Sequence, residues 1–258
     1  MIWSFSMSAA HITRCRSSKK DPIITMNYLQ VKDVSYQYDK EPVLEHVSFQ
    51  VDSGDFVALT GENGTAKTTL MKLIIGILTP RSGSIVRADQ NEAGNPLKLS
   101  YLPQQAASFN SGFPSTVYEF VRSGLYRKGS WLKPFTSEDR TRVLENLRSV
   151  GMWELRAQKI GTLSGGQRQR MIIARMLCSD SDLYLLDEPT TGMDSLTRRH
   201  FYHLLAEKVQ KEHCGILMIT HEYDAVSEYA NKSLHLSKGT ETVSHSDSCE
   251  FPEGGRQC

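Results

Sequence analysis

The sequence predicts an α/β protein with a mainly parallel core sheet, and three stretches support this prediction. The apolar run FVALT (56–60) is followed by the loop GENGTAKTT (61–69), and apolar residues then recur at helical spacing as far as Leu78. DLYLLDE (182–188) and GILMITH (215–221) are two more buried-strand candidates, each after a helical stretch. Such alternation is typical of a parallel sheet covered by helices on both faces.

The bulk composition describes an ordinary globular chain. Its 258 residues are enough for one large domain with a subdomain, and 39% of them are apolar. A net charge of +1 gives no reason to expect nucleic acid as a partner. No apolar run approaches the roughly 20 residues that cross a bilayer, so any role at a membrane is expected to require docking on a partner. The five scattered cysteines favour a reduced, cytosolic chain over a disulfide framework.

The chain divides into a main domain with two loose ends. Folding is expected to begin near Met26, where MNYLQVKDVSYQYD alternates like a strand. Residues 1–25 predict an over-long start or a poorly ordered extension, and residues 241–258 predict a flexible tail whose Cys249 and Cys258 match no structural zinc pattern. Between about 105 and 162, the stretches STVYEFVRSGLY and SEDRTRVLENLRSVGMWELRA predict a helical subdomain.

The loop GENGTAKTT has nearly the pattern of a phosphate-binding loop, G-x-x-x-x-G-K-[ST]. Its glycines allow a tight turn that closes on phosphates, and a helix starting near Lys67 directs its amides there. Lys67 can reach the β- and γ-phosphates, and Thr68 can offer its hydroxyl to Mg²⁺. Ala66 replaces the expected glycine, at little cost if its φ is negative and about 1 kcal/mol or more if it is positive. Taken alone, the stretch could also be an ordinary glycine-rich turn.

The strand candidate DLYLLDEPT ends in two carboxylates, which are expensive to bury unless they have partners or a function. At the carboxyl end of a parallel strand they would face the loop of a neighbouring strand, where such sheets bind ligands. Asp187 would then organise a Mg²⁺ shell, and Glu188 would polarise an attacking water molecule. The alternative is a strand that ends in solvated acids.

A second anion-binding geometry occurs at LSGGQRQR, which runs from Leu163 to Arg170 before the helical MIIARML. A serine and two glycines at a helix start offer a hydroxyl and backbone amides at a positive helix end. One triphosphate hardly needs two such elements from one molecule. The pair makes sense if two copies associate head to tail and each supplies one element to each of two nucleotides.

Six elements, GENGTAKTT, LPQQ, LSGGQ, LLDEP, GMD and MITH, occur in the order and spacing of ATP-binding cassette (ABC) ATPase domains, which the chain resembles over about residues 27–240. The resemblance implies a P-loop ABC-type nucleotide-binding domain over 26–240. Its parts would be a mainly parallel core sheet, an antiparallel β subdomain and a helical subdomain. The resemblance also implies ATP and Mg²⁺ as cofactors and a head-to-tail dimer with a second copy of the chain.

The resemblance assigns roles to single positions. Tyr38 resembles the aromatic residue that stacks on adenine, unless it is only a strand-edge tyrosine; Gln104 resembles the glutamine that touches Mg²⁺ and the attacking water. His221 resembles the switch histidine that reaches the γ-phosphate. Asp194 matches the dimer-interface aspartate, although TTGMD departs from the commoner Ser-Ala-Leu form. The implied catalytic residues are Glu188, His221 and Gln104, and the implied Mg²⁺ residues are Thr68, Gln104 and Asp187. The implied nucleotide-binding residues are Tyr38, Gly61, Asn63, Gly64, Thr65, Ala66, Lys67, Thr68, Thr69, Ser164, Gly165, Gly166, Gln167 and Asp194.

A narrower resemblance concerns cargo. The loop with Ala66, the stretch SFNSGFPSTVYEFVRSG and the stretch SVGMWELR are similar to ATP-binding subunits of high-affinity zinc importers, whose branch also takes up manganese and iron. This implies a peripheral subunit on the cytoplasmic face of the cell membrane, bound to an integral-membrane permease and served indirectly by an extracellular metal-binding protein.

Three alternatives to a zinc importer stay open: the ATPase of a manganese or iron importer, the ATPase of an exporter, and a soluble ABC ATPase acting on ribosomes or DNA. Ribosomal members usually carry two cassettes, and DNA-repair members carry a long coiled-coil insertion; this sequence has neither. The basic, aromatic stretch YRKGSWLKPF (126–135) is interpreted as a solvated loop, so no nucleic-acid partner is expected.

Overall fold

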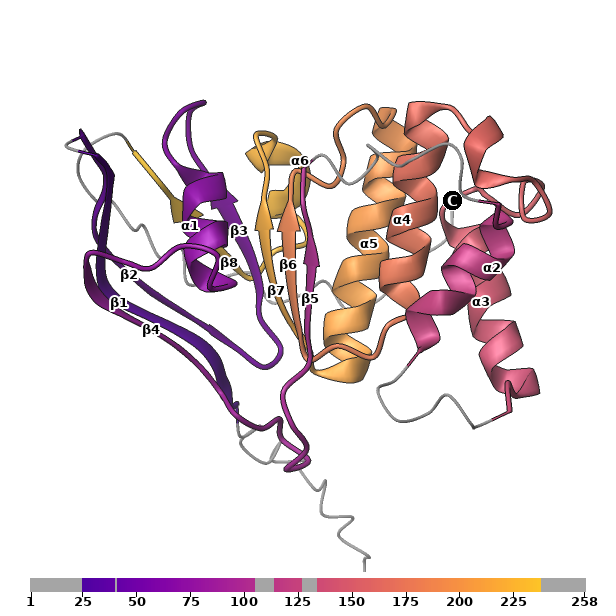
Figure 1. Cartoon of the computed structure of the whole chain (residues 1–258), viewed down its shortest axis with the longest axis horizontal. Coiled ribbons are helices and arrows are strands. Elements are labelled where there is room, and N and C mark those ends of the chain that lie inside the picture. The colour runs from indigo at the N-terminus through magenta and orange to yellow at the C-terminus, as the bar shows by residue number, and fades with distance from the viewer. Residues whose placement is uncertain (1–24, 40, 105–113, 127–133, 238–258) are drawn as a thin grey trace, which may run out of the picture.

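A computed structural model describes residues 25–39, 41–104, 114–126 and 134–237. Residues 1–24 and 238–258 lie outside the described residues, so the expectations for the extension and the tail are not tested. Figure 1 shows the layers in order: an antiparallel sheet, helix α1, a parallel sheet, helices α4 and α5, and finally helices α2 and α3.

The antiparallel sheet consists of β1 (Asn27–Tyr38), β2 (Glu41–Asp52) and β4 (Ser82–Arg87), in the order β2-β1-β4. The strand expected to open near Met26 is therefore present. The segment 41–52 is one strand of 12 residues. Shifts of register between β1 and β2 break the period-two pattern that would mark one long strand in the sequence.

The core sheet has the order β5-β6-β7-β3-β8, and every neighbouring pair is parallel. Its strands are β3 (Phe56–Thr60), β5 (Leu99–Leu102), β6 (Leu183–Asp187), β7 (Gly215–Ile219) and β8 (Lys232–His235). The three strands predicted at 56–60, 182–188 and 215–221 are confirmed as β3, β6 and β7, and all residues of these observed strands are buried. The edge strands β5 and β8 have four residues each and a mixed composition that gave no signal.

Alternate side chains of the core strands fill two hydrophobic cores. Val57, Leu185 and Leu217 join a core with α1 and the antiparallel sheet. Their neighbours Ala58 and Leu186 join a second core with helices α2 to α5. This packing explains why the strands are apolar throughout, since both faces of the sheet are covered.

The helices are α1 (Lys67–Ile74), α2 (Val117–Arg122), α3 (Ser137–Ser149), α4 (Gly165–Cys178), α5 (Ser195–Glu212) and α6 (Tyr223–Ser227). Two 3₁₀ turns occur at Ser123–Leu125 and Ile160–Thr162. Helix α1 ends before the predicted Leu78, because Gly76 adopts a left-handed φ of 83° and Ile77 is 67% exposed. None of these helices has the length and apolar character needed to span a bilayer.

Helix α3 also ends earlier than predicted. The stretch SVGMWELRA leaves the helix at Gly151, whose φ is 66°, and continues as turns. The described part of the segment 105–162 contains α2, α3 and both 3₁₀ turns and, apart from isolated bridges, no strand, and its treatment as a separate subdomain stays a prediction.

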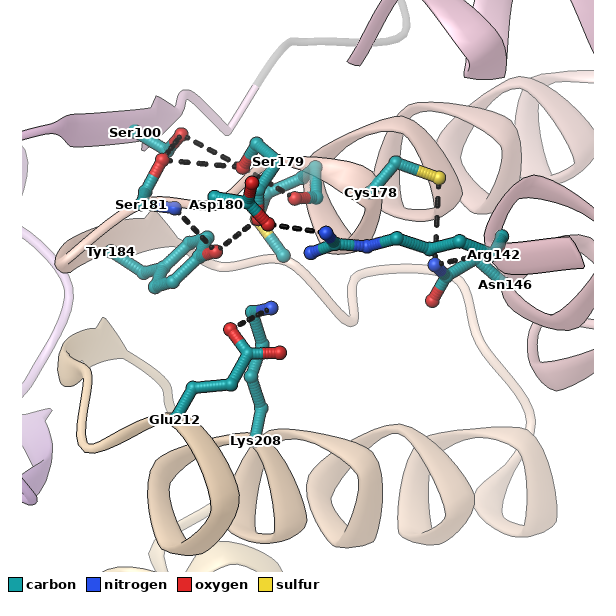
Figure 2. A network of polar contacts seen from close by, with 11 residues as sticks. Ser100, Arg142, Asn146, Cys178, Ser179, Asp180, Ser181, Tyr184, Lys208 and Glu212 are labelled. Atoms are coloured by element: carbon teal, nitrogen blue, oxygen red, sulfur yellow. Dashed lines mark hydrogen bonds and ion pairs between the residues drawn. The ribbon is translucent and has the colours of Figure 1, made fainter. Parts of the chain in front are cut away.

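A polar network attaches α3 to the end of the core sheet that is remote from the loop 61–66 (Figure 2). Arg142 of α3 forms an ion pair with Asp180, and the side-chain amide of Asn146 donates to the Cys178 sulfur at 3.4 Å. The hydroxyl of Tyr184 in β6 donates to the Ser179 carbonyl at 2.6 Å. These bonds hold α3 and the C-terminal end of α4 at the start of β6. The opposite end of β6 carries Asp187.

Candidate functional site

The loop after β3 forms a compact turn that leads directly into α1. Gly61 and Gly64 have φ values of 148° and 84°, in the region that favours glycine. A Cβ atom at Gly61 would lie 2.3 Å from the Leu236 carbonyl oxygen, so the backbone of the segment after β8 closes on the loop at this point. Asn63 and Gly64 are exposed, and Thr65 is buried, with its hydroxyl bonded to the Glu62 carbonyl at 2.8 Å.

Ala66 is the residue immediately before α1, and it adopts the left-handed conformation with φ 64° and ψ 23°. Of the two cases weighed from the sequence, the strained one is therefore observed, at a cost of about 1–2 kcal/mol. This is a conformation that glycine adopts without steric cost, which is consistent with the glycine of the general pattern at this position.

Lys67 opens α1 and turns its ammonium group back over the loop. Its Nζ donates to the carbonyls of Gly61 at 2.8 Å and Glu62 at 2.6 Å. Burial lowers the pKa of Lys67, and the carboxylates of Glu188 and Asp187 partly offset this effect. A cation that is poorly hydrated and held among carbonyl groups is well suited to bind phosphate oxygens.

Asp187 ends β6 and is buried, with 1% of its surface exposed. Neither carboxylate oxygen has a hydrogen-bond partner of good geometry among the described residues, although the Thr68 hydroxyl lies near enough to favour the charged form. Burial raises the pKa of Asp187 above its usual range. A buried carboxylate without donors, beside a threonine hydroxyl, fits the oxygen-ligand preference of Mg²⁺. Thr68 and Asp187 are therefore the residues that would hold the ion.

Glu188 is the centre of a three-residue contact. Its carboxylate accepts a hydrogen bond from the Gln104 side-chain amide at 2.7 Å, and its other oxygen contacts Nε2 of His221. Gln104 follows β5 and His221 follows β7, so the ends of three adjacent strands converge on one carboxylate. The side chain of Glu188 is 16% exposed, which leaves it accessible to water. Glu188 also has a positive φ of 48°, a strained conformation that is common at functional sites.

Ser164 is the N-cap of α4. Its hydroxyl accepts from the Gln167 amide at 3.3 Å, and the Gln167 side chain accepts from the Ser164 amide, which completes a capping box. Gly165 and Gly166 are exposed at this helix start, and a Cβ atom on either would meet nothing within 4 Å. The start of α4 is therefore not covered by other described parts of the chain at these two glycines.

Ser164 and Glu188 line two neighbouring cavities, which have Thr191 and Gly192 in common. Ser164, Gly166 and Gln167 line a cavity of about 120 Å³ together with Asp194, which caps α5 by accepting from the Thr197 amide at 2.9 Å. Glu188 and His221 line another, of about 300 Å³. Among the described residues, Ser164, Gly166, Gln167 and Asp194 do not line the cavity of about 300 Å³.

Tyr38 lies at the end of β1, where it is 44% exposed and makes an edge-on contact with Tyr36, with ring centroids 5.0 Å apart. Its ring is therefore available for stacking, as the adenine role requires, and the strand-edge alternative describes the same position equally well.

Two residues that the sequence did not single out hold the loops of the site. Gln169 is buried in α4 and donates to the Pro189 carbonyl at 3.0 Å. Arg198 in α5 donates to the Met193 carbonyl at 2.9 Å and forms an ion pair with Glu222. Gln169 lies three and four residues before the buried Ile172 and Ile173, on the same face of α4. A polar residue on this apolar face is the sequence feature that could have indicated a buried hydrogen bond. No such feature indicated Arg198.

Comparisons with known proteins agree with this geometry. The family model described as "ABC transporter" matches residues 44–191. The chain is 51% identical over 217 residues to the zinc transport system ATP-binding protein AdcC of Streptococcus pneumoniae, covering 84% of this chain and 93% of that protein. It is 45% identical over 214 residues to the high-affinity zinc uptake system ATP-binding protein ZnuC of Bacillus subtilis, covering 83% and 93%.

Among solved structures, the chain is similar to the dimeric structure of MJ0796, described as a bacterial ABC transporter cassette. The TM-score is 0.65 at 25% identity, over 82% of this chain and 95% of that one. The likeness extends across the sheets and helices described above.

Proposed function

This chain belongs to the ABC transporter family as an ATP-binding, ATP-hydrolysing subunit, and from that membership we propose that it drives the uptake of zinc through a separate membrane permease. ATP-binding cassettes of this family form dimers and bind to membrane permeases. The identity of the permease, the head-to-tail dimer of this chain and the zinc cargo are parts of the proposal.

The observation that carries the catalytic part is the convergence of Gln104 and His221 on the Glu188 carboxylate. In the proposed reaction, Lys67 binds the β- and γ-phosphates and Glu188 accepts a proton from the attacking water. Gln104 and His221 orient that water and the γ-phosphate. Mg²⁺ held by Thr68 and Asp187 would neutralise charge that develops on the phosphate oxygens. Ala66 and the loop glycines shape the backbone around the phosphates, and Tyr38 stacks on adenine.

The second part of the proposal concerns the dimer. The backbone at the exposed start of α4 and the Ser164 hydroxyl would form an anion site, but they line a cavity that adjoins the cavity of Glu188 and that Glu188 does not line. A head-to-tail partner would bring its own γ-phosphate to this helix start, and Asp194 lies at the same surface. Closure is then favoured only while the γ-phosphate is present, and hydrolysis allows the dimer to open. This differential contact would make the dimer a clamp driven by nucleotide, coupled to the permease.

The zinc cargo rests on the two zinc-related proteins named above, which match nearly the whole cassette. In this proposal the subunit lies at the cytoplasmic face of the membrane, and the metal is handled by the permease and an extracellular binding protein. A manganese or iron importer is the alternative that the uptake experiment must separate.

The catalytic roles are tested with Glu188→Gln and Lys67→Ala. Glu188→Gln removes the proton acceptor and keeps the shape, so we expect ATP binding to persist, hydrolysis to fall at least about 100-fold, and a nucleotide-bound dimer to accumulate on size exclusion. Lys67→Ala should instead weaken nucleotide binding, as measured by calorimetry. Wild-type turnover by Glu188→Gln would refute the assigned role of Glu188.

The cargo is tested by metal uptake in cells that lack the protein and are complemented with wild type or Glu188→Gln. Trace zinc and trace manganese are supplied in parallel. Zinc accumulation restored by wild type alone supports the proposal. A response to manganese alone contradicts the zinc assignment and leaves the ATPase assignment intact.

A further inference from the structure

The loop 189–194 and the loop 220–222 lie on either side of Glu188, and a single guanidinium group joins them. One arm of Arg198 donates to the Met193 carbonyl at 2.9 Å, and the other arm pairs with the Glu222 carboxylate. Met193 precedes Asp194, and Glu222 follows His221. One side chain therefore connects the backbone beside the proposed interface residue to the backbone beside the proposed switch residue.

Both ends of this connection are anchored. Asp194 caps α5, and the Arg198 amide donates back to the Asp194 carbonyl at 3.0 Å, so Arg198 projects from the first turn of that helix. On the other side, the Glu222 amide donates to the Thr220 hydroxyl at 3.1 Å, which fixes the turn that presents His221. A movement of either loop would have to break or stretch the Arg198 bonds.

The Arg198 side chain is largely shielded from solvent, whereas the side chain of its partner Glu222 is 44% exposed. The side chain of Arg198 is 21% exposed, and it lines the cavity of about 300 Å³ together with Glu188 and His221. Its Nε is buried and has no hydrogen-bond partner among the described residues. A buried donor without a partner is unfavourable, so the bonds of the two guanidinium arms to Met193 and Glu222 have to hold this side chain in place.

We propose that Arg198 is a positioning residue, which holds the Met193–Asp194 backbone and the His221–Glu222 backbone at one spacing so that dimer contact and the switch histidine become competent together. The other end of the loop 189–194 is held independently by Gln169 at Pro189. Arg198 thus bonds the loop 189–194 to the loop 220–222, which contains His221. The inference rests on the proposed hydrolysis mechanism and does not depend on the cargo.

The test compares Arg198→Ala, Glu222→Ala and the double variant in the purified protein with Mg-ATP. Misplacing a catalytic group by about 1 Å can lower a rate up to 100-fold, so we expect kcat to fall about 10–100-fold in Arg198→Ala, with KM within about threefold. The double variant should be no slower than the slower single variant, because both substitutions remove the same connection. Arg198→Lys, which can pair with Glu222 but lacks the second arm for Met193, should be intermediate.

Arg199→Ala is the matched control, since Arg199 is the next residue in α5 and is exposed. It should retain kcat within about twofold of wild type. A further readout uses the Glu188→Gln background, in which Arg198→Ala should reduce the nucleotide-bound dimer while ATP binding by the monomer is unchanged.

Two results would overturn the inference. One is a kcat of Arg198→Ala within twofold of wild type. The other is a parallel loss of ATP affinity, kcat and thermal stability, which is the signature of a purely structural role. A failure of zinc uptake in cells would contradict the proposed cargo alone, since the readouts here are hydrolysis and dimer formation.

Discussion

Two non-glycine residues of the site, Ala66 and Glu188, hold left-handed backbone conformations with φ values of 64° and 48°. Each conformation is unfavourable by about 1–3 kcal/mol and persists only because its surroundings impose it. Ala66 lies between the loop that follows the buried strand β3 and the helix α1. Glu188 lies between β6 and Pro189, where its amide donates to the Ile219 carbonyl at 3.2 Å. At the scale of the residue, the site therefore stores strain at the start of α1 and just after β6.

Replacing Ala66 by glycine tests this view of the phosphate loop. Glycine relieves the left-handed strain but loosens the unfolded chain, so we expect a net rise in Tm of about 1–3 °C. ATP affinity should remain nearly unchanged, because the loop already has the glycine-like conformation. Calorimetric scanning and titration measure the two quantities. Ala93→Gly, at an exposed turn residue without a positive φ, is the control and should not raise Tm. A tenfold change in ATP affinity would show that Ala66 affects binding directly.

Asp187→Asn tests the buried carboxylate. The folded-state pKa of Asp187 is raised by burial, so its contribution to stability is most favourable below the unfolded pKa and is lost as pH rises through the folded value. At neutral pH, Asp187→Asn removes the unfavourable burial of a charge and should therefore raise the Tm of the nucleotide-free protein. The expected rise is about 2–4 °C for each kcal/mol of stability gained, and it should become smaller in acid. Stabilisation by Mg-ATP should be lost at the same time.

The control for this prediction is Asp182→Asn. Asp182 is hydrogen-bonded by the Asn91 side chain at 2.8 Å and the Lys98 amide at 2.7 Å, so its substitution should lower Tm. If Asp187→Asn also lowered Tm at neutral pH, the carboxylate would have a stabilising partner that the geometry does not reveal.

At the scale of elements, α4 packs against α2, α3 and the 3₁₀ turn Ser123–Leu125, and Gly124 lies in that turn close to α4. A Cβ atom at Gly124 would lie 2.1 Å from the Arg175 carbonyl oxygen of α4. Gly124→Ala should therefore push the 3₁₀ turn away from α4 and destabilise the protein by about 1–3 kcal/mol in urea unfolding. Glu145→Ala, at an exposed position of α3, should change stability by less than about 0.5 kcal/mol. Equal effects of the two substitutions would contradict the close contact.

How far the elements could be predicted depended on what their residues bury. The strands β3, β6 and β7 are covered on both faces and read as continuous apolar runs, so they were predicted correctly. Strand β4 is almost wholly exposed, and β5 and β8 are short edge strands whose partners are distant in sequence. The ends of α1 and α3 were missed because Gly76 and Gly151 stop helices whose apolar spacing continues beyond them.

At the scale of the whole molecule, the meeting of the phosphate loop, Gln104, Glu188 and His221 could be predicted in outline, because they follow strands of one parallel sheet and such strands end at a common edge. The bonds of Arg198 and Gln169 could not be predicted, since they join residues whose approach depends on how α4 and α5 pack on that sheet. Sequence thus pointed to the groups that are proposed to act on the nucleotide, but not to the side chains that hold their loops in place.

In one chain, Ser164 and Glu188 line two different cavities, and this arrangement has a genetic consequence. If each nucleotide is enclosed by Lys67 and Glu188 of one subunit and Ser164 of the other, a Glu188→Gln subunit impairs every dimer that it enters. With equal expression of both forms and random pairing, only about a quarter of the dimers would be fully wild type. We therefore expect this allele to act dominantly and to lower zinc accumulation well below half in cells that also carry the wild-type gene. Lys67→Ala combined with Glu188→Gln, which should not hold the closed dimer, should interfere less.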